Sequence, residues 1–168
     1  LTQEEIEGEL RQAFGLKRVL WVDSGSLSGD DTDSHIDILA RFCDPETIAY
    51  LKSEDAEDPD YEGLMNMEAQ LKSFRTPDGK PYRLVPLPKP EQMFLDDYPL
   101  PASYANFLII NGAVLVPGSG SELDEVARTR LQEVFTDREV IVIDCRPLLS
   151  GHGGLHCVTM QFPEGWLE

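Results

Sequence analysis

The chain has 168 residues and a formal net charge of −17, and 41% of its residues are hydrophobic. This length allows a single domain with a buried core, and the sequence shows neither a signal peptide nor an apolar run long enough to cross a membrane. The acidic balance argues against nucleic acid as a partner and favours a cationic ligand, although a general contribution to solubility explains the same charge.

The three cysteines, Cys43, Cys145 and Cys157, are an odd number without CxxC spacing. We therefore expect reduced thiols and a cytoplasmic setting rather than a disulfide framework. No HExxH motif is present, so we expect neither a metal ion nor another cofactor.

A helix is predicted at the start of the chain. Thr2 and Glu5 have the spacing of a capping box, and Gly15 is a favourable residue for ending the helix. The apolar run over residues 19–22 then predicts a buried strand.

Residues 35–42 alternate in character, which predicts a strand with His35 and Asp37 on the same face. Two polar side chains at the start of one strand can converge on a single ligand. An edge strand with a solvated polar face is the alternative explanation of the same alternation.

In the middle of the chain, the sequence predicts a short strand or a turn over residues 47–51, a helix over 64–74 and a strand over 82–85. The proline density of residues 86–101 excludes a regular helix or a central strand. Because this segment also carries aromatic side chains, we expect a lid or a site-lining loop rather than a linker.

Asn111 and Gly112 separate two apolar runs, residues 103–110 and 113–116, which is typical of a β-hairpin. A helix capped by Ser121 is predicted next. The sequence then predicts two more strands, over residues 140–143 and 155–160. A hairpin, a helix and a returning strand thus occur twice, which favours a modular α/β fold.

Cys157 follows the glycine-rich stretch 150–154, where the backbone can approach a ligand closely. A thiolate is a nucleophile, a histidine can transfer protons, and a carboxylate can hold a planar guanidinium through paired hydrogen bonds. Cys157, His35 and Asp37 are therefore a candidate site for guanidine hydrolysis, although Cys157 taken alone is more typical of a buried structural thiol.

Two further histidines flank this cysteine. Strand alternation predicts that His156 points to the opposite face from Cys157 and packs there. His152 is expected to be a solvent-facing loop residue.

Three segments resemble the agmatine deiminases and the closely related bacterial peptidylarginine deiminases. They are GDDTDSHIDILARF, PASYANFLIINGAVLVP and GHGGLHCVTMQ, which begin at residues 29, 101 and 151. They occur in the family's order and together span most of the chain, so the resemblance is specific.

The resemblance implies a role for each matching residue. Cys157 would attack the guanidinium carbon and form a covalent thiouronium, with His35 as proton donor and then as the base that activates water. Asp37 would hold two guanidine nitrogens, Asn106 would line the pocket, and Gly153 and Gly154 would shape the loop that carries Cys157. With agmatine, the products would be N-carbamoylputrescine and ammonia, a step of putrescine biosynthesis in polyamine metabolism.

The resemblance also implies a partial α/β-propeller, or pentein, of which about two to three of the five ββαβ modules are present. Residues 1–168 would then be the C-terminal part of a deiminase catalytic domain whose N-terminal half carries a further aspartate. His152, where many agmatine deiminases have glycine, bears on the substrate.

The expected partner is a small cationic guanidine such as agmatine, and neither nucleic acid nor a membrane is expected. One alternative is a peptidylarginine deiminase that acts on arginine in peptides. From a different class, a non-catalytic fragment or interaction module could keep the fold without turnover. Open sheet edges would also favour self-association into a homo-oligomer.

Overall fold

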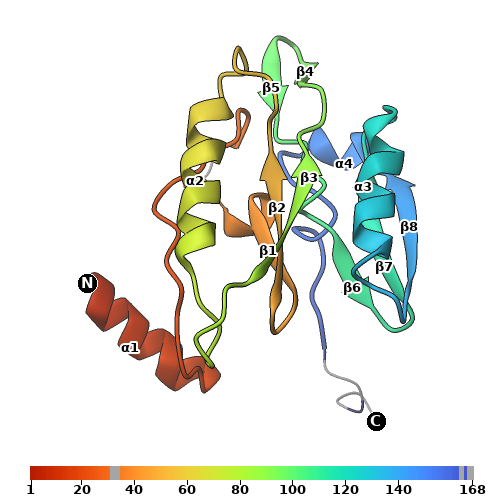
Figure 1. Cartoon of the computed structure of the whole chain (residues 1–168). Coiled ribbons are helices and arrows are strands. Elements are labelled where there is room, and N and C mark those ends of the chain that lie inside the picture. The colour runs from red at the N-terminus through yellow and green to blue at the C-terminus, as the bar shows by residue number, and fades with distance from the viewer. Residues whose placement is uncertain (31–34, 163–164, 166–168) are drawn as a thin grey trace.

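The computed structural model describes residues 1–30, 35–162 and 165 (Figure 1). Two three-stranded sheets form the body of this mixed α/β fold. The first sheet contains β1 (Ala40–Asp44), β2 (Thr47–Lys52) and β3 (Arg83–Pro88), and the second contains β6 (Leu108–Ile110), β7 (Ala113–Gly118) and β8 (Glu139–Asp144).

The two sheets have the same topology. In the first, β1 and β2 pair antiparallel and β3 returns parallel to β2 after helix α2 (Tyr61–Ser73). In the second, β6 and β7 form the antiparallel pair and β8 returns parallel to β7 after helix α3 (Leu123–Gln132). Parallel neighbours need such a crossover, and the helix covers one face of its sheet. The sequence of two hairpin, helix and strand units is therefore confirmed.

Local sequence explains most of these elements. Gly112 has φ +79°, so the Asn111-Gly112 turn supplies the left-handed conformation that a tight hairpin requires. The predicted hairpin is confirmed. The predicted Ser121 cap is wrong by one residue, because the N-cap of the following helix is Glu122, which makes no side-chain capping hydrogen bond. Ser121 Oγ accepts the amide of Leu123 at 3.2 Å from one position before the cap.

The core divides into two main clusters of buried apolar side chains. The first contains Leu51, Leu64, Met67 and Leu71 between α2 and its sheet. The second is centred on the second unit, where Tyr104, Phe107 and Phe135 are its largest side chains, and it also includes residues of β2 and β3. Tyr104 and Phe107 come from the segment before β6, so this segment is itself part of the core.

The predicted strand over residues 35–42 is wrong in its first half. Residues Ile36–Ile38 form a 3-10 turn (η1), and the strand begins only at Ala40. The carbonyl of Ile38 accepts the Ser103 hydroxyl at 2.6 Å instead of a neighbouring strand's amide. His35 and Asp37 therefore do not share a strand face.

The strand predicted over residues 103–110 is shorter than expected, and the strand predicted over residues 155–160 is wrong. Residues 103–107 form a buried turn in which the amide of Ala105 donates to Ser103 Oγ, and the strand starts only at Leu108. Residues 155–160 contain turns, because Thr159 folds back onto the His156 carbonyl through its amide and its hydroxyl. In both segments local hydrogen bonds replace a ladder.

The proline-rich segment contains more regular structure than predicted. β3 continues to Pro88, and a separate hairpin of β4 (Met93–Leu95) and β5 (Tyr98–Leu100) follows. A short helix, α4 (Arg146–Leu149), was not predicted. It begins with a proline in its first turn, where the missing N–H costs nothing.

Helix α1 (Gln3–Phe14) has the predicted capping box between Thr2 and Glu5, and Gly15 ends it with φ +64°. None of its residues is buried, and Figure 1 shows it extending away from both sheets. Residues 19–22 were predicted as a buried strand but are not part of either sheet. No described helix is long and apolar enough to span a membrane.

Candidate active site

Three segments that are distant in sequence meet at one cluster of polar side chains. Asp37 comes from η1, Asn106 from the buried turn before β6, and His156 and Cys157 from the turns near the C-terminus. We call these four residues the Asp37 cluster. It unites three of the six predicted site residues with one, His156, that was predicted to point away.

Asn106 is the central member of the Asp37 cluster. Its side chain is 1% exposed, and Nδ2 donates to Asp37 Oδ2 at 3.0 Å and lies 3.4 Å from Cys157 Sγ. Its Oδ1 accepts the His156 backbone amide at 2.8 Å. A single buried amide thus fixes the relative positions of the carboxylate, the histidine and the thiol.

Asp37 Oδ2 lies 2.8 Å from His156 Nδ1 and accepts the Cys157 thiol at 3.5 Å. Burial raises the pKa of Asp37, but the hydrogen bond and charge of His156, with the bonds from the thiol and the amide, outweigh it. The pKa of Asp37 therefore lies below its ordinary value of 3.8, and the carboxylate is negatively charged at neutral pH.

Cys157 is the only exposed thiol among the three described cysteines. Burial raises the pKa of Cys43 to about 12 and also raises that of Cys145, so both are unreactive core thiols at neutral pH. Cys157 is therefore the one that can meet a dissolved electrophile. The reading of Cys157 as a buried structural thiol does not hold.

His35 is the residue directly before η1, the turn that carries Asp37. It is exposed, and its backbone amide donates to Asp30 Oδ2 at 3.0 Å. Within the described residues, no hydrogen bond joins its imidazole to Cys157 or Asp37. The catalytic role of His35 stays a prediction.

His156 was predicted to lie on the face opposite Cys157, and this is wrong. The prediction assumed a strand, whereas the turn after Gly154 directs both His156 and Cys157 toward Asp37. His152 is exposed as expected, has φ +59°, and packs edge-on against Tyr98 with ring centroids 5.2 Å apart.

The two adjacent glycines of the cysteine loop differ in what surrounds them. A Cβ on Gly154 would lie 2.2 Å from Asn106 Oδ1, which is closer than any non-bonded contact allows. A Cβ on Gly153 would meet the Cβ of Cys157 at an ordinary 3.4 Å. Only Gly154 is thus required for the loop to pack against Asn106.

The turn that carries Asn106 is held from two sides. Ser103 binds the Ile38 carbonyl next to Asp37, and the Tyr104 hydroxyl donates to Asp124 Oδ1 at 2.6 Å at the start of α3. Tyr104 is fully buried, and burial together with this carboxylate raises its pKa to about 12. Sequence patterning missed this support because it treated the segment as a strand.

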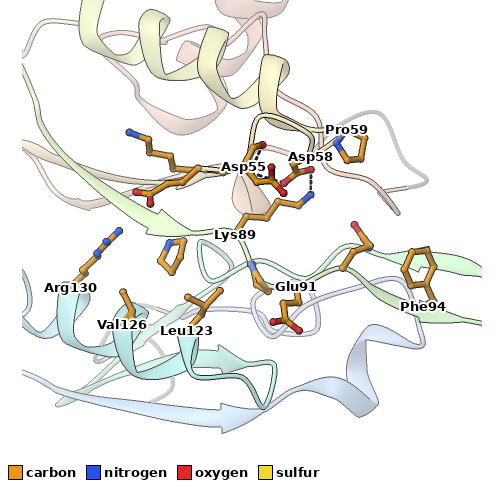
Figure 2. Close-up of a pocket in the computed structure, with 15 residues that line it drawn as sticks. Asp55, Asp58, Pro59, Lys89, Glu91, Phe94, Leu123, Val126 and Arg130 are labelled. Carbon is orange, nitrogen blue, oxygen red and sulfur yellow. Dashed lines mark hydrogen bonds and ion pairs between the residues drawn. The ribbon is translucent and has the colours of Figure 1, made fainter.

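A separate groove of about 700 Å³ lies between α3 and the β2–α2 connection (Figure 2). Lys89 Nζ is buried there and pairs with Asp58 and Asp60 at 2.6 Å each. No member of the Asp37 cluster lines this groove. Among the described residues, no group of three or more His, Cys, Asp or Glu side chains is placed to hold a metal ion.

The Asp37 cluster combines an exposed thiol with a charged carboxylate within 3.5 Å of it. A carboxylate can accept two hydrogen bonds from one planar guanidinium, which would bring the cationic carbon close to the sulfur. A positively charged carbon beside a thiolate is an activated target for nucleophilic attack. This geometry suits covalent chemistry on a small cation.

Comparison with known proteins identifies relatives along almost the whole chain. The family model described as Porphyromonas-type peptidyl-arginine deiminase matches residues 1–163. The agmatine deiminase of Stutzerimonas stutzeri is 31% identical, with 97% of this chain and 49% of that protein aligned. The chain thus spans about half the length of the curated relatives it matches.

Solved structures of arginine and agmatine deiminases are also similar to this chain. A crystal structure from Porphyromonas gingivalis, named as a candidate arginine deiminase, has a TM-score of 0.95 and 57% identity, covering 98% of this chain and 49% of that one. Agmatine deiminase of C. jejuni, a cysteine-to-serine variant with substrate bound, has a TM-score of 0.87 and 39% identity, covering 94% and 45%.

Proposed function

The chain belongs to the Porphyromonas-type peptidyl-arginine deiminase family, and from this membership we propose that the whole protein hydrolyses a guanidine group, with agmatine as the substrate. The observation that carries the proposal is the contact of Asp37 with the exposed Cys157 thiol in one Asn106-centred cluster. Relatives named agmatine deiminase support the reaction class. The products would be N-carbamoylputrescine and ammonia.

In the proposed reaction, Asp37 holds two guanidine N–H groups and so places the guanidinium carbon beside Cys157. The thiolate adds to this carbon, the C–N bond to one nitrogen breaks, and ammonia leaves with a proton from His35. Water then adds to the thiouronium with His35 as base, and the C–S bond breaks to release the urea product and the thiolate. The sum is one guanidine and one water converted to one urea and one ammonia.

His156 has a supporting role in this scheme. Its Nδ1 lies 2.8 Å from Asp37 Oδ2, and it lowers the pKa of that carboxyl. It therefore keeps Asp37 charged and oriented for the guanidinium. Asn106 and the closely packed Gly154 backbone fix the position of the sulfur relative to that carboxylate.

We further propose that residues 1–168 are the C-terminal part of one catalytic domain with a propeller arrangement of ββαβ modules. The repeated topology of the two units and the half-length match to relatives support this. The other half would supply the remaining side of the guanidine site. This expectation also explains why the Asp37 cluster is open to solvent.

The family name gives peptidylarginine as the second candidate substrate. A peptide requires an open groove at the distal end of the substrate, whereas free agmatine fits a closed site. Ammonia release from a blocked arginyl peptide, but not from agmatine, would select this alternative.

Rapid acid quenching tests the covalent step directly. The full-length protein would be mixed with agmatine, quenched within the first turnover, digested and analysed by mass spectrometry. We expect an adduct of agmatine less ammonia on the peptide that contains Cys157, and no adduct in Cys157→Ala. Turnover without an adduct on this peptide would contradict the proposal.

A further inference from the structure

We propose that Arg41 is a positioning residue of this site, which anchors the Asn106 turn. This inference rests on the proposed function only for its catalytic consequence. The anchoring is argued from the geometry of the described residues.

Arg41 connects the two units at the point where the site is built. It belongs to β1 of the first unit, and its NH1 donates to the Phe107 carbonyl of the second unit at 2.6 Å. The guanidinium carbon also lies 5.0 Å from the centre of the Phe107 ring, which is within the range of a cation–π contact. Phe107 is fully buried and packs edge-on against Phe135.

Arg41 binds Phe107, which is the residue directly after Asn106 in the chain. Asn106 contacts each of the other three members of the Asp37 cluster. A displacement of the Phe107 carbonyl would move the Asn106 backbone and hence its buried amide. Arg41 therefore acts on the site through a backbone carbonyl without touching the reacting atoms.

The charge of Arg41 guides the choice of test variants. Burial lowers the pKa of the Arg41 guanidinium, and the nearby Asp37 carboxylate offsets part of this effect. The guanidinium stays charged at neutral pH, so lysine is the substitution that keeps the charge while it removes the planar hydrogen-bonding group.

Alkylation of Cys157 by iodoacetamide at neutral pH tests the inference without any substrate. Peptide mass spectrometry would follow Cys157 separately from the half-buried Cys43 and the buried Cys145 in the full-length protein. We expect Arg41→Met to change the alkylation rate of Cys157 about fivefold or more, because a displaced Asn106 turn moves the amide that lies 3.4 Å from the sulfur. Arg41→Lys keeps the charge but not the planar contacts, so its alkylation rate should also depart from that of the parent.

Arg130 offers a matched control. It is also a half-buried arginine that donates to a backbone carbonyl, that of Pro86 at 2.7 Å, but within the described residues it makes no hydrogen bond to the Asp37 cluster. Arg130→Met should leave the alkylation rate unchanged even if it lowers the melting temperature. An unchanged rate in Arg41→Met, or an equal change in both methionine variants, would overturn the inference.

Measuring kcat for ammonia release distinguishes a failure of this inference from a failure of the proposed function. In full-length protein that releases ammonia, Arg41→Lys should lower kcat about tenfold or more, because lysine keeps the charge but not the planar contacts that anchor the Asn106 turn. An Arg41→Lys enzyme with parental kcat would overturn the anchoring role. If the parent releases no ammonia from any guanidine, the proposed function fails, and the alkylation rates still decide the role of Arg41.

Discussion

At the scale of single residues, the site depends on how closely the Gly154 backbone approaches Asn106. We expect Gly154→Ala to displace the Asn106 amide, since the added Cβ would lie 2.2 Å from Oδ1. A displacement of this size should lower ammonia release about 100-fold, with a loss of about 1–3 kcal/mol in unfolding free energy. The measurements are steady-state turnover and urea unfolding.

Gly153→Ala is the control for this prediction. Its Cβ would make only an ordinary contact at 3.4 Å, and its φ is not in the left-handed region. We expect activity close to that of the parent. Equal losses in both alanine variants would mean that general loop flexibility, rather than the Asn106 contact, is what the glycines provide.

A second prediction concerns His156, whose hydrogen bond and charge oppose the effect of burial on Asp37. In His156→Ala the burial effect remains while this opposition is lost, so the pKa of Asp37 should rise. Carboxyl 13C NMR of the protein across the acid range measures it, with His152→Ala as the control. An Asp37 titration that does not move in His156→Ala would contradict the assigned pairing.

The sequence predicted which residues belong to the site better than it predicted the directions of their side chains. Asp37, Asn106 and Cys157 were singled out by their motifs, and they do meet. His156 was missed because its direction depends on a turn, and the assumed strand reversed it. A residue type can be read from a motif, but the direction of its side chain requires the local backbone.

At the scale of elements, the segment 103–107 connects the site to the start of α3 through Tyr104 and Asp124. Burial raises the pKa of Asp124, but the Tyr104 hydroxyl and the amides of Ser119 and Gly120 outweigh it, so the pKa lies below its ordinary value of 3.8. A lowered folded-state pKa stabilises the protein above the unfolded-state value. This stabilisation is lost as the pH falls through the folded-state pKa.

We therefore expect Asp124→Asn to lower the unfolding free energy by about 1 kcal/mol near neutral pH, since partial exposure screens the interaction. The difference from the parent should disappear as the pH falls well below 3.8. Urea unfolding at a series of pH values measures this. Glu125 lies on the same helix and forms an exposed ion pair with Arg128, so Glu125→Gln should have little effect on the unfolding free energy. A pH-independent difference for Asp124→Asn would contradict the account.

Elements with strong periodicity or specific end residues were predicted correctly, such as α1 with its capping box and the Asn111-Gly112 hairpin. The strands over residues 35–39, 103–107 and 155–160 were not, because their apolar content reflects burial in turns. In these segments hydrogen bonds from distant residues decide the backbone, as Ser103 does for Ile38. Such long-range partners leave no local pattern.

At the scale of the whole molecule, the chain aligns with about half of the length of its relatives. Several of its large apolar side chains are exposed. They include Phe42, Ile36, Phe14 and Met160 at 53%, 50%, 71% and 80% exposure. Ile36 and Phe42 line the same hollow, and a contiguous exposed apolar patch is typical of an interface. We expect a second half of the full-length protein to cover part of it.

It follows that the 168-residue chain alone should turn over agmatine at least about 100-fold more slowly than the full-length protein, because half of the guanidine clamp is missing. It should also self-associate in sedimentation velocity experiments, and added N-terminal half should both disperse it and restore turnover. Rates comparable to full-length protein from a monomeric 168-residue chain would refute the proposed division of the catalytic domain.

The most direct test of guanidine hydrolysis is ammonia release from agmatine, arginine and a blocked arginyl peptide by the full-length protein, measured beside Cys157→Ala. The account predicts turnover of agmatine, with no ammonia above background from the variant. Release from the peptide alone would assign the peptidylarginine substrate. Undiminished release by Cys157→Ala, or no release from any of the three compounds by the parent, would contradict the central claim.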